Sequence, residues 1–347
     1  MELTLYTSFL FFTLILFPSL HLSTPTHPNH CFQNDQNTLL RIKKDFNNST
    51  LFSTWVPGSD CCRWSGVACK KLPKTKTYRV NFLEVNFGLD IVGTIPSSVG
   101  DLPYLETLII RGNSNLTGPI PPAIAKLTNV GLLLLNFNSL TGPIPSFLTK
   151  LTKLVTLELN DNQLTGTIPS FLGHMPQLSA LDFSNNHLIG PIPSNLGLLP
   201  KLSFLTLTNN MLSGPIPRSL GNLNFEILEL GSNRFTGDAS FLFGESKTNY
   251  AHLGLEANKL SFDFSKVVLP VDSLNSSLLV FNMSHNMIYG RLPAWLGEAP
   301  VLYSLDVSYN RLCGAIPTIG GKLQGFEAST FEHNKCLCGA PLPPCKS

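Results

Sequence analysis

The chain has 347 residues, 43% hydrophobic and 13% charged, with a formal net charge of +2 at pH 7. A net charge this close to zero gives no overall field that would attract nucleic acid, so we expect no nucleic-acid partner. The length alone would allow two ordinary domains, but a leucine pattern repeated over most of the chain favours a single repeat array.

The chain begins with its longest apolar run, residues 3–22, followed by a polar segment rich in proline and histidine. We predict that residues 1–24 are a secretory signal peptide, although Glu2 stands where a basic residue is usual. The alternative is an uncleaved membrane anchor. No second apolar run has membrane-spanning length, so we expect no membrane segment after signal cleavage.

The cysteines form two groups at the ends of the repeats: Cys31, Cys61, Cys62 and Cys69, then Cys313, Cys336, Cys338 and Cys345. Terminal repeats lack one neighbour, so we predict disulfide-stapled caps at residues 25–79 and 326–347, in an oxidising compartment. A zinc site is the competing interpretation. The adjacent and CxC spacings do not match zinc motifs, and we predict no metal and no cofactor.

Within the first cap, Asn34 or Asp35 is expected to cap a helix with an apolar face. Trp55 and Trp64 should cover the first leucines. A basic cluster follows, and its members are Lys70, Lys71, Lys74, Lys76 and Arg79. We expect a solvated turn there, with contact to an acidic polysaccharide as the alternative.

Residues 80–325 repeat the pattern LxxLxLxxNxL, as at Leu154, Leu178 and Leu202, which are 24 residues apart. We predict an α/β solenoid, a right-handed leucine-rich repeat superhelix of ten repeats. Leucines on alternate positions of a short strand point into the core. The repeated asparagine, as at Asn162, should bond turn backbone and form a ladder, broken only at Gly88. The TGxIP segment should form a tight second segment followed by a short helical return.

The GxIP segments resemble the plant-specific class of leucine-rich repeats. The ends are more specific: DCCRWSGVAC before the repeats and CLCGAPLPPC after them look like the polygalacturonase-inhibiting proteins of plant cell walls. This resemblance implies the pairs Cys31–Cys61, Cys62–Cys69, Cys313–Cys336 and Cys338–Cys345. It also implies a secreted, non-enzymatic, extracellular cell-wall protein that inhibits fungal or plant polygalacturonases in defence. The alternative is an apoplastic adaptor or co-receptor-like protein that binds a receptor ectodomain, and pectin is a further candidate partner.

The outward strand positions should gather on one concave sheet, the usual recognition surface of solenoids. Its carboxylates outnumber its one fixed cation, Arg111, which favours a partner with a basic cleft; the alternative is an ordinary solvated surface. Its N-terminal half is apolar, as expected of an interface. The predicted partner-binding residues are Leu134, Phe137, Glu158, Asp161, Asp182, Phe204, Glu229 and Glu256.

Glycosylation sequons occur at Asn48, Asn115, Asn275 and Asn282. Asn282 lies on an outward strand position, where a glycan would crowd the C-terminal end of the concave face. No catalytic motif is present. Glu158 and Asp182 fall on adjacent strands, as in a glycosidase pair. We expect nothing to desolvate them or raise their pKa values on an open face, and therefore predict that the protein is not an enzyme.

Overall fold

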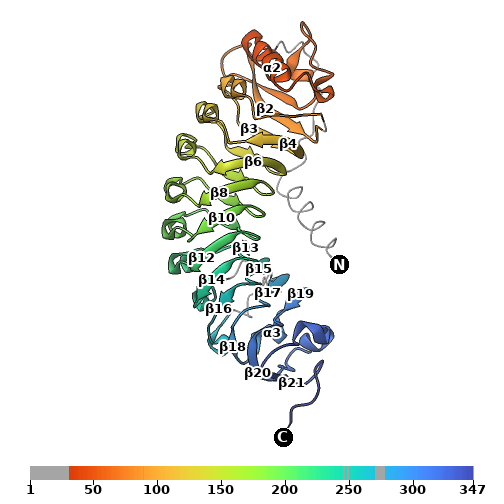
Figure 1. The fold of residues 1–347 in the computed structure, drawn as a ribbon, viewed down its shortest axis with the longest axis vertical. Helices are drawn as coiled ribbons and strands as arrows, with labels where there is room; N and C mark the ends of the chain where they lie inside the picture. The colour runs from red at the N-terminus through yellow and green to blue at the C-terminus, as the bar shows by residue number, and fades with distance from the viewer. Residues whose placement is uncertain (1–30, 89, 245–246, 248–249, 270–277, 347) are drawn as a thin grey trace.

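The computed structural model describes residues 31–88, 90–244, 247, 250–269 and 278–346. Over these residues the chain forms an elongated, curved solenoid with the two caps at opposite ends (Figure 1). The predicted signal peptide, residues 270–277 of the eighth repeat and the sequon at Asn275 lie outside the described residues.

The inner wall is an eleven-stranded sheet with the order β1-β2-β3-β5-β7-β9-β11-β13-β15-β17-β19. β1 pairs antiparallel with β2, and the other pairs are parallel. The strands are β1 Val67–Lys71, β2 Tyr78–Asn86, β3 Thr107–Arg111, β5 Leu132–Leu134, β7 Thr156–Glu158, β9 Ala180–Asp182, β11 Phe204–Thr206, β13 Ile227–Glu229, β15 His252–Gly254, β17 Val280–Asn282 and β19 Ser304–Asp306. The strands from β2 onward match the ten predicted repeats one for one.

The alternation of the repeat determines which side chains enter the core. In β7, Leu157 and the following Leu159 are fully buried, while Thr156 and Glu158 face outward and are partly exposed. The same positions in the neighbouring repeats supply one continuous apolar core. Because each repeat covers its neighbour's leucines, the array is stable only as a stack.

The TGxIP segments form a second layer. A seven-stranded parallel sheet runs β16-β14-β12-β10-β8-β6-β4. Its strands are β4 Asn113–Gly118, β6 Asn138–Pro143, β8 Gln163–Thr167, β10 His187–Gly190, β12 Met211–Pro215, β14 Arg234–Gly237 and β16 Lys259–Leu260. Gly166 has a φ of +80°, which explains the glycine, and Pro169 leads into a 3-10 helix.

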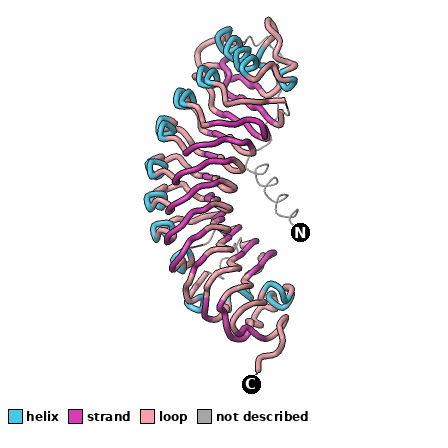
Figure 2. Tube along the Cα trace, in the orientation of Figure 1, coloured by secondary structure: helices cyan, strands magenta, loops and turns pink. Residues whose placement is uncertain are grey.

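Short 3-10 helices form the outer, convex side, opposite the inner sheet (Figure 2). They are η3 Ser97–Asp101, η4 Pro122–Lys126, η5 Ser146–Lys150, η6 Ser170–His174, η7 Ser194–Leu198, η8 Arg218–Asn222, η9 Ser240–Leu242 and η10 Phe264–Lys266, followed by the short α-helix α3 Trp295–Glu298. The predicted helical return is therefore confirmed. The stack curves because the strands on the inner side and the helical turns on the outer side do not pack at the same spacing.

The asparagine ladder is confirmed. The Asn186 amide donates to the carbonyl oxygens of Leu159, Phe183 and Ser184 at 3.0–3.2 Å, and its Oδ1 accepts from the Leu164 N–H at 2.9 Å. At the first repeat, Gly88 donates its N–H to Asn113. Asn334, inside the C-terminal cap, adds a rung that the repeat count did not include.

The N-terminal cap contains the helix α2, Gln33–Asp45, with the 3-10 turns η1 Thr50–Phe52 and η2 Cys61–Arg63. The predicted helix cap is wrong: Phe32 is the N-cap residue, and Asp35 lies inside the helix. Asp35 instead accepts two hydrogen bonds from Arg79, at 2.8 and 2.9 Å, and one from the Val80 N–H. The Arg79 side chain is 11% exposed, so it does not belong to a solvated basic turn. This buried pair joins the cap to the first strand.

Both predicted tryptophans are buried in the cap, Trp55 fully and Trp64 at 4% exposure. The four disulfides have the expected pairing. All eight cysteines are used, so the zinc alternative has no thiolates. The last repeats contribute β18 Tyr289–Gly290, β20 Arg311–Ala315 and η11 Leu323–Gly325, and the C-terminal cap contains η12 Ala328–Thr330 and β21 Cys336–Cys338, which extends the three-stranded sheet β18-β20-β21. Over the described ranges, helices long and apolar enough for a bilayer do not occur.

Candidate functional site

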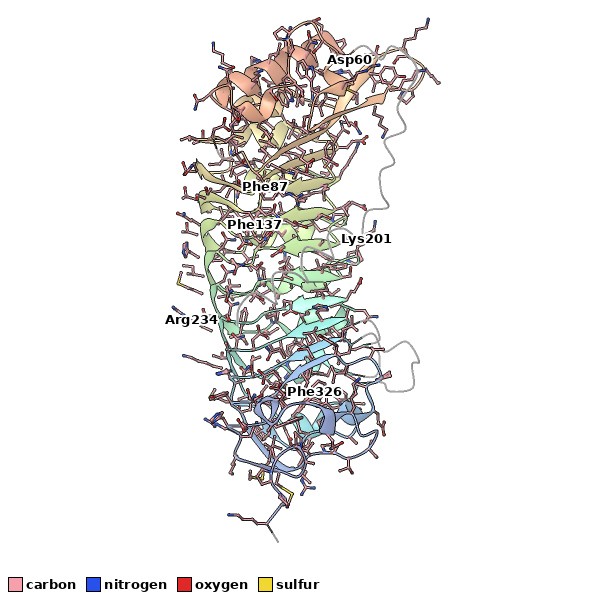
Figure 3. All side chains as sticks on the ribbon, turned by 90° about the vertical axis from the view of Figure 1, so that its right-hand side faces the viewer. Asp60, Phe87, Phe137, Lys201, Arg234 and Phe326 are labelled. Carbon is pink, nitrogen blue, oxygen red and sulfur yellow. A yellow bond between two sulfur atoms is a disulfide. The ribbon has the colours of Figure 1, made fainter. Side chains whose placement is uncertain are left out.

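The concave face is the outward side of the inner sheet, which faces the viewer in Figure 3. Because neighbouring strands pair in register, equivalent positions form columns along it: Thr206, for example, is paired with Asp182 on one side and Glu229 on the other. We call one of them the central column: Glu84, Ile109, Leu134, Glu158, Asp182, Thr206, Glu229, Gly254, Asn282 and Asp306.

A second column follows the strands. Each of its members directly precedes an asparagine of the ladder or, at the first repeat, Gly88. We call it the turn column: Phe87, Gly112, Phe137, Asp161, Asn185, Asn209, Ser232, Ala257, His285, Tyr309 and His333. Of the predicted partner-binding residues, Phe137 and Asp161 lie here, whereas Leu134, Glu158, Asp182 and Glu229 lie in the central column.

Several carboxyl groups in the middle of this face are desolvated, contrary to the expectation that an open face would leave the pKa values of Glu158 and Asp182 unchanged. Burial, with the charge of Asp182 as a smaller cause, raises the pKa of Glu158 to about 7. Burial also raises the pKa values of Asp161 and Asp182. The cause is the close spacing of parallel strands, which lets side chains on adjacent strands screen one another from water.

Glu229 and Glu256 form a second acidic pair that depends on two glycines. A Cβ added to Gly254 would meet Glu229 Oε2 at 1.8 Å, and one added to Gly231 would meet Glu256 Oε1 at 1.9 Å. The two carboxyl groups therefore fill space that side chains occupy in other repeats. Burial, followed by repulsion from Glu256, raises the pKa of Glu229 to about 8. Burial likewise raises the pKa of Glu256.

These shifts correct the simple charge count. Near pH 5 Glu158 and Glu229 are mostly protonated, and these two groups become charged only as pH rises through 7 to 8. Arg111 lies 3.9 Å from Glu84, so the N-terminal part of the face carries one compensated charge pair. The acidity is concentrated in the middle of the array.

Two predicted contact residues have little exposed surface: Leu134 is 6% exposed and Asp182 is 8% exposed. Asp182 uses Oδ1 to accept from the N–H and hydroxyl of Ser184. Phe204 is partly buried, whereas Phe137 is 42% exposed. Phe87, which was not among the predicted contacts, is 65% exposed. The sequence had placed it among the outward apolar residues of the N-terminal half of this face, without choosing it as a contact.

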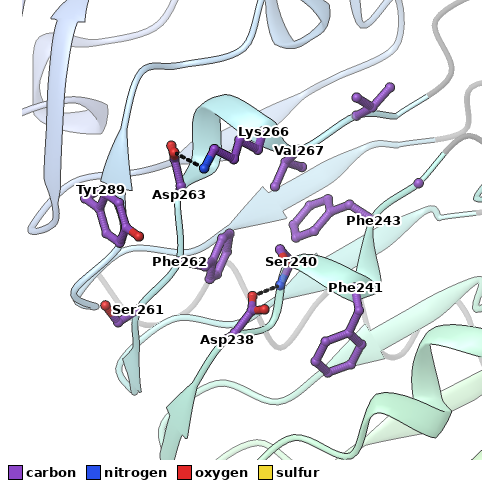
Figure 4. A pocket seen from close by; sticks show the side chains of 12 residues that line it. Asp238, Ser240, Phe241, Phe243, Ser261, Phe262, Asp263, Lys266, Val267 and Tyr289 are labelled. Carbon is purple, nitrogen blue, oxygen red and sulfur yellow. Dashed lines mark hydrogen bonds and ion pairs between the residues drawn. The ribbon is translucent and has the colours of Figure 1, made fainter.

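A pocket of about 550 Å³ lies away from these carboxyl groups (Figure 4). It opens between η9 and η10, on the other side of the repeats. Its rim carries Asp238, which accepts from the Ser240 N–H at 2.8 Å, and Asp263, which lies 3.4 Å from Lys266. Phe243 and Phe262 form its nearly buried floor. The carboxylates are already paired within the chain.

The described sequons differ in their surroundings. Asn48 and Asn115 are exposed. Asn282 Oδ1 accepts from the N–H and hydroxyl of Ser284, which is 3% exposed. The carboxamide of Asn282 is thus held within the folded strand.

Comparisons with known proteins agree with the architecture. Residues 32–70 match the Leucine rich repeat N-terminal domain, and residues 153–175, 177–199 and 201–223 match Leucine Rich Repeat units. The chain is 56% identical to Polygalacturonase inhibitor 1 of Arabidopsis thaliana, over 96% of this chain and 98% of that protein. It is 51% identical to the Polygalacturonase inhibitor of Vitis vinifera, over 93% of each. The crystal structure of a plant ice-binding protein superposes with a TM-score of 0.85 at 39% identity, over 92% of this chain and 99% of that one.

Proposed function

Because this chain belongs to the polygalacturonase-inhibitor family of leucine-rich repeat proteins, we propose that it binds a fungal or plant polygalacturonase through its concave face and blocks the enzyme's active-site cleft. The observation that carries this proposal is the extent of the likeness, which includes both caps and the repeats between them. The protein itself acts as an inhibitor and performs no catalysis.

The chemistry of the concave face supports this kind of partner. An enzyme that grips a polyanionic pectin chain presents lysine or arginine around its cleft. When its carboxyl groups are ionised, the acidic middle of the array, with Glu158, Asp161, Glu229 and Glu256, complements such a surface and steers its approach. Phe137 supplies apolar contact beside Asp161. Asp182 acts through its charge on Glu158 rather than by direct contact.

The proposed organisation follows the same family. Residues 1–24 direct secretion and are removed, residues 25–79 and 326–347 cap the array, and residues 80–325 carry the binding face. Four disulfides suit an oxidising compartment. The mature protein acts outside the cell, in the cell wall, and Asn48 and Asn115 are exposed positions where glycans would not obstruct the concave face.

A reducing-sugar assay tests the proposal. Purified protein is added to a panel of fungal and plant polygalacturonases acting on polygalacturonate, and inhibition of at least one enzyme is expected. A surface-binding measurement with the same enzyme gives the affinity and the association rate. Leu198→Asn, on the convex side and 69% exposed in the parent chain, is a control that should inhibit normally.

Failure across the panel would contradict inhibition. Recovery of a receptor ectodomain by the intact protein would then favour an adaptor. A thermal-hysteresis measurement on the same preparation would reveal ice binding of the kind named for the structural neighbour.

A further inference from the structure

The turn column has one backbone conformation and very different side chains. All eleven residues, from Phe87 to His333, have a positive φ of between 50° and 70°. This left-handed conformation is required where the chain leaves each strand for the buried asparagine. It suits glycine, asparagine and aspartate, and it is unfavourable for bulky side chains.

Most of the column uses residues that fit this conformation or are paired along it. The Asn185 amide donates to Asp161 at 3.0 Å, and the Asn209 amide donates to Asn185 at 2.8 Å. At the C-terminal end the rings of His285, Tyr309 and His333 stack with centroids 4.2 and 4.1 Å apart. Contacts within the chain therefore explain the residues at those positions.

Phe87 and Phe137 are different. Both combine a bulky side chain with a left-handed backbone, at φ values of 52° and 55°, and both are exposed, at 65% and 42%. A Cβ on Gly112, between them, would lie 2.3 Å from the Phe87 ring, so this ring covers the glycine. Figure 3 shows the two residues close together in the N-terminal half of the concave face. The left-handed backbone does not favour phenylalanine at either position, and although the Phe87 ring covers Gly112, much of the surface of both rings stays exposed.

We propose that Phe87 and Phe137 form a paired apolar anchor that receives an aliphatic or aromatic side chain of the bound polygalacturonase. The proposal rests on the proposed function and assigns one end of its interface. Aromatic side chains are frequent binding hot spots because they supply a large, rigid contact area. Local strain and exposure at the same two residues are the features expected where a site serves a partner.

The charges around Phe87 and Phe137 indicate which kind of partner side chain binds there. Glu84 and Arg111 lie 3.9 Å apart, and the Arg111 guanidinium carbon is 5.9 Å from the Phe87 ring centroid. Charge is thus balanced at this end, while the carboxyl groups lie further along the array. A partner that matches the whole face presents an uncharged apolar side chain here and basic side chains toward Glu158 and Glu229. This arrangement fixes the direction in which the enzyme lies along the solenoid.

Phe87→Asn and Phe137→Asn, alone and combined, test the anchor without the usual risk of unfolding, since asparagine suits the left-handed conformation. We expect the thermal midpoint of the double variant to be unchanged or higher, while its dissociation constant for an inhibited polygalacturonase rises at least 30-fold, mainly through faster dissociation. Each single variant should show a smaller loss. Leu198→Asn removes an exposed apolar side chain from the opposite side and should bind as the parent does.

Unchanged affinity in the folded double variant would overturn the anchor while leaving inhibition intact. If the parent protein inhibits no enzyme, the proposed function itself fails, and the two results are thus distinguishable. Light scattering tests whether a second copy of the chain occupies this site. If the parent protein is a dimer and the double variant is a monomer, the two rings serve self-association and the proposal is overturned. Binding of a neutral oligosaccharide that depends on the two rings, with enzyme affinity unchanged, would do the same.

Discussion

The ladder asparagines and the turn column are adjacent along the chain, yet the ladder position keeps one residue type and the turn column carries many. Asn162, Asn186 and Asn210 each bond the same three kinds of backbone carbonyl, one repeat after another. The residues immediately before them are aspartate and asparagine, and in the other repeats the turn column has phenylalanine, glycine, serine, alanine, histidine or tyrosine. The inside of the stack presents an identical environment to every repeat, whereas the outside does not. A position that carries the same residue in every repeat is therefore one fixed by packing, and a position whose residue varies lies on surface that is available for a partner.

Substituting two adjacent residues, one in the ladder and one in the turn column, should give the largest difference in the free energy of unfolding. Asn186→Ala leaves three carbonyl groups and one N–H without their side-chain partner, and we expect a loss of about 4 kcal/mol in the free energy of unfolding. Asn185→Gly, one residue earlier, keeps a residue suited to positive φ and should change stability by less than about 1 kcal/mol. Urea denaturation measures both. Equal losses would mean that the columns do not differ as described.

The ends of the ladder depend on the caps, so removing a cap disulfide tests how far the regular interior is self-supporting. Replacing Cys31 and Cys61 by serine opens a 30-residue separation, and the chain-entropy model predicts a loss of roughly 3 to 4 kcal/mol. Replacing Cys338 and Cys345, 7 residues apart, should cost roughly 2 to 3 kcal/mol. Thermal unfolding of both double variants gives the order; a smaller effect for the first pair would contradict it.

A pH titration separates the central column from ordinary surface carboxylates. The pKa of Glu229 is raised from 4.5 to about 8 in the folded protein, so the folded state keeps this proton when the unfolded state has already lost it. Stability should therefore fall as pH rises from about 5 to 8, by at most about 5 kcal/mol for this group, and level off above that range. Denaturation of the parent and of Glu229→Gln at each pH measures this. The variant should lose the part of the slope that Glu229 contributes, most visibly between about pH 7 and 8, while the raised pKa of Glu158 keeps a slope below pH 7; an unchanged slope would place the titration elsewhere.

The smallest expected effect is on the rate of association. Asp161→Asn removes one partly exposed charge from the turn column while leaving a side chain like those of Asn185 and Asn209. We expect an association rate about threefold lower at low salt, a difference that shrinks as salt screens the charges. Stopped-flow binding to an inhibited polygalacturonase measures it. A reduction that persists at high salt would indicate lost contact rather than lost steering.

Much of the fold follows from local chemistry that a reader can see in one repeat. The alternation at Leu157 and Leu159, the turn glycine Gly166 and the ladder asparagine Asn162 each satisfy a requirement within the repeat or of the next one. The position of the caps followed from the cysteines. Asp35 was misplaced because its partner, Arg79, is 44 residues away and only the folded chain brings the two together.

The amino-acid sequence by itself determined the repeat, its inward leucines, its ladder and the face left outward, because a periodic chain repeats the same local interactions. The tertiary structure decided how much of that face is usable: it buried Leu134 and Asp182, raised the pKa values of Glu158 and Glu229, and left Phe87 and Phe137 exposed. Those outcomes depend on which side chains stand beside each other on neighbouring strands. The exposure and the ionisation of these side chains depend on packing between neighbouring repeats, so they cannot be deduced from the sequence of one repeat.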